Sequence, residues 1–461
     1  MNSRSGITPA RLKLLRQLLW LYFWLLIFEG ALRRWLLPGL ATPLLLVRDP
    51  IALLAVIWAW PLISKRPWLA WLQPLLWIAP IALLLAITVG HGDLPTALFG
   101  TRILLLQLPL IFVFAEVFNR ADVIRFAWVT LGLSIPMTLL LVAQSNLPET
   151  HFLNVGTGGI GTAVFDGAAG RFRPPGTFSF INGVSLFFSL AAASFFVLLY
   201  GAPISQRGRL FCMVAGIALI VAVPVSISRS LLAGYLQVTA ALIAALLLSR
   251  SRIVPVLSGI AAILVAIVIA TATPAFQQTA EAFSTRWEMA AQAEADTTDT
   301  ALTSGAGVFQ TRVLGSFLNP LTNLESIPLL GYGIGIGTNL GSQRLSGGLT
   351  FLVGEGAWEA TLGELGLPLG LSFLIWRLAL AVWILRLSLR VAVQGNRLPL
   401  ILAGFSFLVV LGGQLGQPTG LGFFVVSAGL NLAAFNGVPA TPQQVRLAVP
   451  SPAQSKLSAT A

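Results

Sequence analysis

GYGIGIGTNL (Gly331–Leu340) and EGAWEATLGELGLPLG (Glu355–Gly370) stand out as polar, glycine-dense segments in a chain that is otherwise mostly apolar. Both belong to the stretch from Arg312 to Gly370, which holds an arginine, a glycine-dense turn region and three carboxylates directly before a new apolar helix. Polar chemistry at a membrane boundary is costly and is therefore a functional hypothesis by default. We expect the functional site to be built in this stretch.

The composition around this stretch is that of a membrane protein. Of 461 residues, 56% are hydrophobic and 10% are charged, and the mean hydropathy is +0.86, whereas about 25% of the residues of a soluble domain are charged. The net charge of +12 comes from basic residues that stand singly or in pairs between apolar segments. That pattern orients membrane spans and does not favour nucleic-acid binding. We predict an all-α polytopic membrane protein.

Cysteine and histidine are too sparse to predict a disulfide or a metal centre. Cys212 is the single cysteine, and the two histidines, His91 and His151, lie far apart in the sequence. The first apolar run, from Leu14, continues without a small-residue cleavage site, so we expect no cleavable signal peptide. No metal or other cofactor is predicted.

Apolar windows of roughly 17 to 25 residues mark the candidate spans. Twelve windows lie at 14–30, 48–64, 68–89, 95–118, 123–144, 179–200, 210–227, 229–248, 253–272, 357–385, 398–414 and 418–436. A short re-entrant or interfacial helix is expected within 31–47. The predicted organisation is nine transmembrane helices in 1–272, a long loop with short helices at 273–356, three further helices in 357–436, and a disordered tail at 437–461.

Basic residues divide the connecting loops between two sides of the membrane. If the N-terminus is cytoplasmic, the loops on its side carry most of the cations, including all three lysines: Arg4, Arg11, Lys13, Arg16, Lys65, Arg66, Arg120, Arg125, Arg207, Arg209, Arg250, Arg252, Arg386, Arg390, Arg397, Arg446 and Lys456. The two long loops, at about 145–178 and 273–356, fall on the opposite side. We therefore expect both termini in the cytoplasm and the functional site outside.

The outer side keeps cations that are all arginines: Arg33, Arg34, Arg48, Arg102, Arg171, Arg173, Arg229, Arg286, Arg312 and Arg344. Arginine binds phosphate with two parallel N–H groups, whereas lysine acts as a point charge. The set therefore predicts recognition of an anionic substrate, with Arg171, Arg173 and Arg344 among the binding residues. The alternative is that single arginines reach lipid headgroups or pair with acidic residues such as Glu29 and Asp49.

Two shorter motifs contain some of these arginines. FEGALRRWLLP (Phe28–Pro38) and the LLLVRDP segment that follows favour a structural ion-pair clamp, with Glu29 paired to arginines and Arg48 paired to Asp49. SISRSLLAGYL (Ser226–Leu236) places Arg229 at the outer start of a span. A helix N-terminus together with a guanidinium is a suitable anion site, although a purely structural arginine is the alternative.

The carboxylates before the tenth predicted span suit proton transfer. If the chain is helical from about Gly354, Glu355 and Glu359 lie on one face and Glu364 lies nearly opposite. Two neighbouring carboxylates resist simultaneous ionisation, which raises one pKa and suits a general acid or base. The alternative is that they pair with outer arginines such as Arg312.

The order of these motifs resembles the O-antigen ligase and O-antigen polymerase superfamily of bacterial envelope glycosyltransferases. The features that match are an arginine after serine at the outer start of a mid-chain span, an arginine in a long outer loop, a GYGxG turn, and a helix with ELGxxG. The resemblance covers roughly Arg171 to Gly370. It implies a GT-C-like architecture in the bacterial inner membrane and metal-independent transfer, on the periplasmic side, of a glycan from undecaprenyl pyrophosphate to another glycan or to a lipid A core. Membrane lipids and polysaccharide assembly machinery are further partners it implies.

The same resemblance implies roles for single residues. Arg229 and Arg312 correspond to the arginines that stabilise the leaving pyrophosphate, and Tyr332 and Glu359 are expected to contact substrate. Glu355 stands where the family has a histidine associated with activating the acceptor hydroxyl. A carboxylate can also accept that proton, but the departure favours a polymerase-type or exopolysaccharide-type member over a ligase.

Two other functional classes compete with this interpretation. A transporter of lipid-linked glycan or of polyanionic polymer would suit twelve spans and many cations, but the two halves of the chain show no convincing repeat. A non-catalytic assembly subunit would explain the missing histidine.

Overall fold

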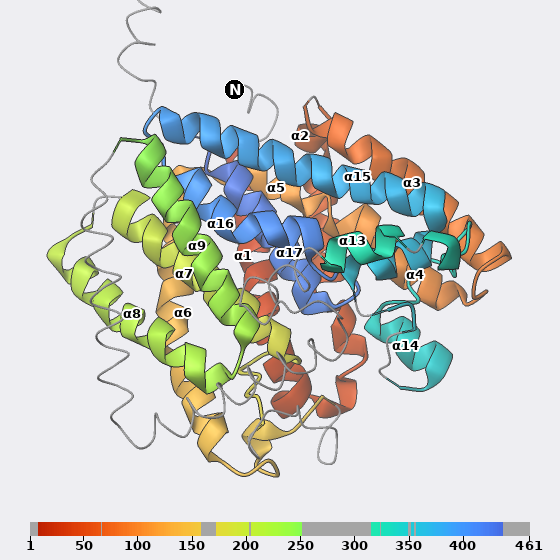
Figure 1. The fold of residues 1–461 in the computed structure, drawn as a ribbon, viewed down its shortest axis with the longest axis horizontal. Helices are drawn as coiled ribbons and strands as arrows, with labels where there is room; N and C mark the ends of the chain where they lie inside the picture. The colour runs from red at the N-terminus through yellow and green to blue at the C-terminus, as the bar shows by residue number, and fades with distance from the viewer. Residues whose placement is uncertain are drawn as a thin grey trace, which may run out of the picture.

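Long apolar runs form the helices of this protein (Figure 1), because a chain in lipid must satisfy its backbone hydrogen bonds within itself. The computed structural model describes residues 8–65, 67–157, 172–201, 204–250, 315–322, 324–348, 352–354 and 356–436. The predicted span at 253–272, the first part of the long loop and the tail at 437–461 lie outside the described residues.

Nine helical segments of the described chain are long and apolar enough to cross a membrane. They contain α1 (Pro9–Ala31), α2 (Asp49–Ile63), α3 (Trp68–Thr88), α4 (Leu94–Arg102) joined to α5 (Leu110–Val117), α6 (Arg120–Asn146), α7 (Ile181–Gly201), α8 (Gln206–Ser226), α9 (Arg229–Leu248) and α15 (Ala357–Val393). Two shorter apolar helices follow, α16 (Leu398–Gly412) and α17 (Pro418–Ala433). The prediction of a polytopic α-helical membrane protein is confirmed; the total of twelve spans stays a prediction.

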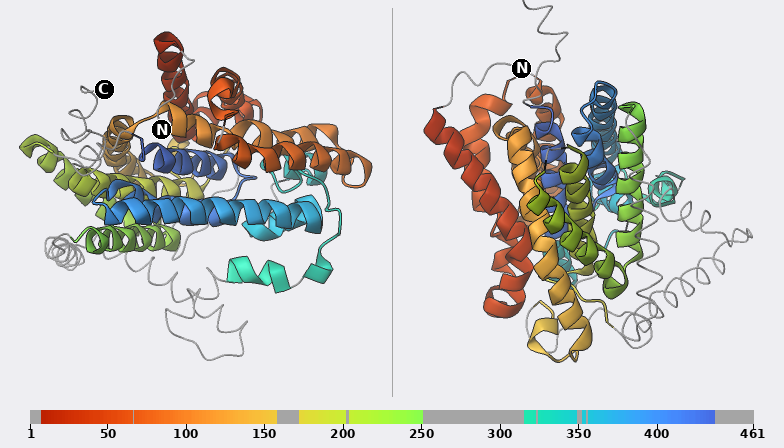
Figure 2. Two further views of the ribbon diagram at one scale, coloured as in Figure 1. Left: turned by 90° about the horizontal axis from the view of Figure 1, so that it is seen from above. Right: turned by 90° about the vertical axis from the view of Figure 1, so that its left-hand side faces the viewer.

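The helices run side by side, as the right-hand view of Figure 2 shows, and their ends group as the loop charges predict. At one end, Arg120 of α6 donates to the carbonyl oxygen of Gly201 (2.5 Å) and to Asn396 Oδ1 (2.6 Å), and its backbone N–H donates to Asn436 O (3.0 Å). At the other end, Asn182 of α7 donates to Gln417 Oε1 (3.3 Å). The chain therefore alternates between two ends, and the cytoplasmic side of the bundle stays a prediction.

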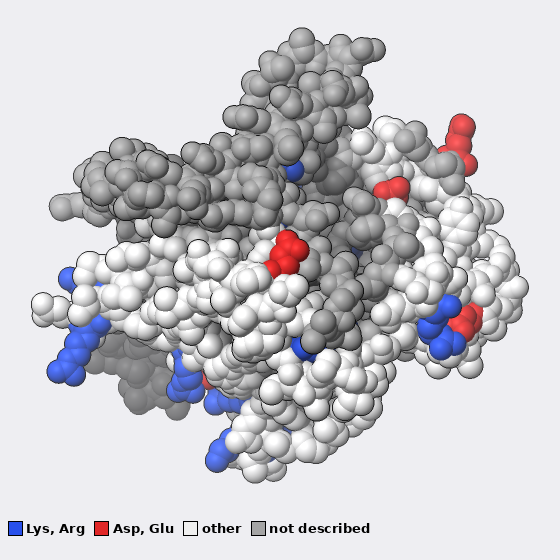
Figure 3. Space-filling view, turned by 90° about the horizontal axis from the view of Figure 1, so that it is seen from below, with Lys and Arg blue, Asp and Glu red and all other residues white. Residues whose placement is uncertain are grey.

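The exterior of the bundle is apolar. Large hydrophobic side chains such as Trp77 of α3 (71% exposed), Ile217 of α8 and Ile375 of α15 face outward. On the face shown in Figure 3, few of the described residues are charged. A soluble protein rarely exposes apolar area on this scale, so the surface is suited to lipid.

Irregular helical turns extend, connect or interrupt several of the first spans. The π-helical turn η1 (Leu32–Leu36) extends α1, and the 3-10 turns η2 (Pro38–Leu40) and η3 (Pro43–Leu46) lead to α2. A second π-helical turn, η4 (Ile103–Gln107), joins α4 to α5. The short interfacial element expected within 31–47 therefore exists as three separate turns. Such π-turns occur frequently at functional sites.

Helix α15 is broken at Gly366, where φ is +72° and ψ is 179°. The window at 357–385 predicts one continuous span, and the structure corrects that prediction. Pro368 lacks an N–H and cannot continue the hydrogen-bond ladder from the preceding turn. The backbone of the glycine turn takes over instead: Tyr332 N donates to Gly363 O (2.7 Å), and Gly333 N donates to Glu364 O (3.1 Å). The break thus joins the two motifs that dominate the sequence.

Candidate functional site

The glycine turn Gly331–Gly337 is wedged between α4 and the break in α15. Gly335 has φ +96°, and a Cβ atom there would lie 2.1 Å from the carbonyl oxygen of Thr96. A Cβ on Gly100 would in turn lie 2.5 Å from Gly335 N. The backbones therefore touch directly, which only glycine permits. His91 fixes the same turn, because its backbone N–H donates to Tyr332 O (3.0 Å).

Helix α14 (Asn339–Ser346) follows the turn and is tied to α4 by an ion pair. Thr338 caps its first turn by accepting a hydrogen bond from Gly341 N (3.0 Å). Arg344 donates through Nε and Nη2 to the two carboxylate oxygens of Asp93, both at 2.8 Å. These hydrogen bonds hold the pKa of the Asp93 carboxyl well below its usual range. Arg344, expected to bind substrate, contacts Asp93 and lies outside the linings of both cavities described next.

A cavity of about 180 Å³ lies between the glycine turn, the start of α15 and the loop that joins α16 to α17. We call it the polar cavity, because seven of its described lining residues carry a hydroxyl, amide or carboxylate group: Thr338, Asn339, Ser342, Thr361, Glu364, Gln414 and Gln417. Glu364 is the one charged residue among its described lining residues. Its Oε1 accepts a hydrogen bond from Gly337 N (2.7 Å).

A second cavity, of about 750 Å³, lies between α7, α9 and α16. We call it the apolar cavity, because side chains such as Leu186, Leu232, Leu236, Leu408 and Val409 line most of it. On α9 its lining extends from Arg229 to Ala240, about 16 Å at the helical rise per residue. Arg229 lines one end of this cavity, at the first residue of α9, next to Ser230. The volume lies within the range of about 300–1,000 Å³ that is usual for ligand sites.

The two cavities share a wall. Gln414 and Gln417 line both of them. Both residues belong to the loop between α16 and α17, and two buried arginines hold its ends. Arg377 of α15 donates to Gly413 O (2.8 Å), and Arg48 donates to Pro418 O (2.5 Å). The loop is therefore fixed by side chains that lie far from it in the sequence.

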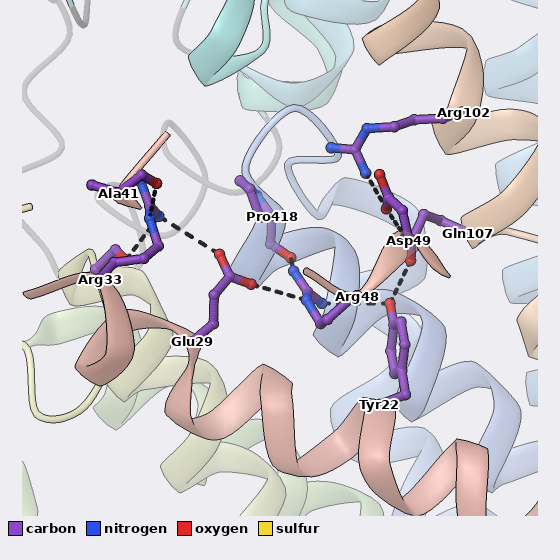
Figure 4. A network of polar contacts seen from close by, with 10 residues as sticks. Tyr22, Glu29, Arg33, Ala41, Arg48, Asp49, Arg102, Gln107 and Pro418 are labelled. Atoms are coloured by element: carbon purple, nitrogen blue, oxygen red, sulfur yellow. Dashed lines mark hydrogen bonds and ion pairs between the residues drawn. The ribbon is translucent and has the colours of Figure 1, made fainter. Parts of the chain in front are cut away.

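Arg48 is part of a buried polar network (Figure 4). Its Nε donates to Glu29 Oε2 (3.0 Å), so the predicted clamp exists. The predicted pairing of Arg48 with Asp49 is wrong: Asp49 Oδ1 accepts hydrogen bonds from Arg102 Nη1 and Gln107 Nε2, both at 2.6 Å. Consecutive residues at a helix start point in different directions, so Arg48 meets α1 and α17 while Asp49 meets α4 and η4.

Most of the outer arginines that the structure describes contact protein groups. Arg34 donates to the carbonyl oxygens of Val155, Leu153, Gly176 and Phe178, at distances from 2.7 to 3.1 Å. Arg33 donates to Ala41 O (2.7 Å) and Ser179 Oγ (3.0 Å). Arg173 is partly buried, Arg229 lines the apolar cavity, and both also interact with protein groups. Structural contacts therefore explain much of the outer set, as the alternative interpretation expects.

Several expected site residues lie outside the described residues, namely Arg171, Arg312 and Glu355. The chain neighbours of Glu355, Gly354 and Gly356, both line the polar cavity. Glu359 instead caps the start of α15, where its Oε2 accepts a hydrogen bond from Gly356 N (3.5 Å), and it is not among the described cavity-lining residues. Tyr332 is half exposed, at 50%, and holds the turn through its backbone.

The sequence interpretation assigned no role to three cavity residues, Glu364, Gln414 and Gln417. The amides Gln414 and Gln417 in GGQLGQP (Gly412–Pro418), where the windows 398–414 and 418–436 meet, are the signal in the sequence that could have identified this loop. Among the described residues, no three His, Cys, Asp or Glu side chains lie together in a way that could hold a metal ion.

No protein-family model matches the sequence, and no curated protein matches it either.

Proposed function

We propose that this protein is a glycosyltransferase of the bacterial inner membrane that moves a glycan from undecaprenyl pyrophosphate to a hydroxyl group of a glycan or lipid acceptor. The observation that carries the proposal is the pair of adjoining cavities. One is long and apolar with an arginine at one end, the other is polar, and Gln414 and Gln417 line both.

The apolar cavity suits the lipid carrier. A polyprenyl chain needs an apolar groove between helices, and Leu232, Leu236 and Leu408 provide one. The pyrophosphate then lies at Arg229, whose guanidinium and helix N-terminus both favour negative charge. Charge develops on the pyrophosphate as the glycosidic bond breaks, so a donor fixed at that place lowers the barrier. Arg312 has the same role in the resemblance.

The polar cavity suits the acceptor. Thr338, Ser342 and Thr361 offer hydroxyl groups, and Asn339 offers an amide, which are the groups that bind sugar hydroxyls. Donor and acceptor meet where the two cavities share Gln414 and Gln417. We place this junction on the periplasmic side, and the replacement of the family histidine by Glu355 favours a polymerase-type enzyme over a ligase.

A transporter of lipid-linked glycan is the second candidate, because α15 is broken beside a cavity. Broken helices at substrate sites are typical of secondary transporters. The two functions differ in their products: a transferase makes a new glycosidic bond and releases undecaprenyl pyrophosphate, whereas a transporter moves the lipid-linked glycan intact.

The test is a transfer assay with the full chain in lipid vesicles. The donor is undecaprenyl-pyrophosphate-linked glycan extracted from a strain in which this gene is deleted, and mass spectrometry detects longer glycan and free undecaprenyl pyrophosphate. We expect wild type and Arg207→Ala, an exposed arginine at the opposite end of the bundle, to form product. Arg229→Ala should be inactive, and Arg229→Lys should recover little activity. Movement of intact donor by wild type, without a new bond, would favour the transporter.

A further inference from the structure

We propose that Glu364 is the catalytic residue that accepts the proton from the attacking acceptor hydroxyl. The inference rests on the proposed transfer reaction and assigns its base. It places the base on a residue whose position in the polar cavity the structure describes.

The position of Glu364 follows from the break in α15. A carboxylate two residues before a broken turn is held by contacts on both sides: its backbone oxygen accepts from Gly333 N (3.1 Å), and its Oε1 accepts from Gly337 N (2.7 Å). A Cβ atom on Gly337 would lie 2.7 Å from Oε1, so a larger residue there would displace the carboxylate from this position. The side chain is thus fixed in one orientation on the cavity wall.

The surroundings of Glu364 favour substrate contact. The cavity lining beside it carries neutral hydrogen-bonding groups from Thr338, Ser342 and Thr361. A sugar hydroxyl that enters this cavity finds one carboxyl group among the described lining residues, and the ionised form of a carboxyl group is a strong acceptor for a hydroxyl proton. The other described carboxylate nearby, Glu359, contacts Gly356 N and is not among the described cavity-lining residues.

The step balances without a co-reactant. The acceptor oxygen forms a bond to the anomeric carbon of the donor sugar while the bond from that carbon to the pyrophosphate oxygen breaks. The electron pair of the broken bond leaves on the pyrophosphate, next to Arg229. The hydroxyl proton passes to the Glu364 carboxylate, which returns it to water before the next cycle.

The substitution Glu364→Gln distinguishes a catalytic role of Glu364 from a purely structural one. In Glu364→Gln the amide oxygen still accepts from Gly337 N, so the turn keeps its contact, but the side chain no longer takes a proton. We expect kcat to fall by roughly 10² to 10⁴, the usual contribution of general base catalysis, with little change in KM for the acceptor. Thermal denaturation should stay at the wild-type temperature. Glu364→Ala should lose both the rate and part of the stability.

The controls are Glu325→Gln, an exposed carboxylate outside the described cavity linings, and Glu355→Gln. Glu325→Gln should transfer at the wild-type rate. If Glu364→Gln transfers within about threefold of wild type while Glu355→Gln is inactive, Glu364 is only a structural acceptor and the inference is wrong. That result leaves the proposed function intact, because wild type still transfers. A wild-type protein that makes no new glycosidic bond from the extracted donor refutes the proposed function instead.

Discussion

The break in α15 predicts a large effect for the substitution Gly366→Ala. Gly366 has φ +72° and ψ 179°, a region that only glycine occupies readily and that costs other residues about 1–3 kcal/mol. An added Cβ would lie 2.3 Å from Leu329 O and 2.5 Å from Gly331 N. Both are backbone atoms, one in the glycine turn and one two residues before it, so no flexible side chain can move aside. Such overpacking costs a further amount of about 1–3 kcal/mol. Together these effects reach about 2–6 kcal/mol, a large part of the 5–15 kcal/mol typical of folded proteins.

Substitutions at two other glycines distinguish the cost of backbone strain from the cost of the clash. Gly92 has φ +71° but nothing within 4 Å of an added Cβ, so Gly92→Ala carries backbone strain alone. Gly39 has open space and no positive φ, so Gly39→Ala should change little. Tryptophan fluorescence during heating in detergent should therefore rank wild type and Gly39→Ala first, Gly92→Ala next and Gly366→Ala last. Equal denaturation temperatures for Gly366→Ala and Gly92→Ala would show that the clash between the added Cβ and the backbone near the turn does not lower the stability.

Three further predictions concern the network, the exposed ion pair and the topology. Arg48→Ala removes the cation 3.0 Å from the buried carboxylate of Glu29 and leaves it with Arg33, 3.6 Å away; breaking a buried pair completely costs about 3–5 kcal/mol, so denaturation in detergent should occur at a lower temperature by part of this amount, and an unchanged temperature would contradict the clamp. The depressed pKa of Asp93 stabilises the fold above the ordinary carboxyl pKa of about 4 and loses this effect as the pH falls towards the folded value; Asp93→Asn should therefore be less stable than wild type at pH 7, with the difference shrinking below about pH 4. A reporter fused after Pro320 should be periplasmic and one fused after Gly395 cytoplasmic, and the reverse result would move the site to the other side of the membrane.

The spans were predictable because hydropathy measures how apolar a segment is, and a segment must be apolar to lie in the hydrocarbon core of a bilayer. The window 229–248 coincides with α9 (Arg229–Leu248), and the window 68–89 lies within one residue of α3 (Trp68–Thr88). The break at Gly366 was not predicted, because an apolar window averages over a glycine and a proline. The break is possible because the turn at Gly331–Gly337 supplies hydrogen bonds to carbonyl groups that α15 leaves unpaired. Hydropathy does not show which distant segment supplies such hydrogen bonds.

The meeting of the two glycine-rich motifs was predictable from the sequence, whereas most of the residues that line the candidate site were not. The Gly331–Leu340 and Glu355–Gly370 motifs do meet, and both contribute to the polar cavity. Whether an arginine contacts protein groups or lines a cavity depends on residues far away in the sequence. Arg48, for example, donates a hydrogen bond to Pro418 O. The sequence does not distinguish an arginine that donates a hydrogen bond to a backbone carbonyl oxygen from an arginine that lines a cavity. Structural and substrate-binding cations could therefore not be separated there.

The short length of α16 explains how a polar site can lie within the depth of the bundle. Its 15 residues extend about 22 Å, less than the roughly 30 Å of a bilayer core, so the loop to α17 begins before the helix has crossed. A helix that ends there leaves carbonyl groups without partners. Arg377, which is fully buried, donates to two of them, Val410 O (3.0 Å) and Gly413 O (2.8 Å). With these carbonyls satisfied, the loop can hold Gln414 and Gln417 between an apolar cavity and a polar one. In the proposed reaction, this arrangement would let a lipid carrier stay in the apolar cavity and a hydrophilic acceptor stay in the polar cavity while the two react.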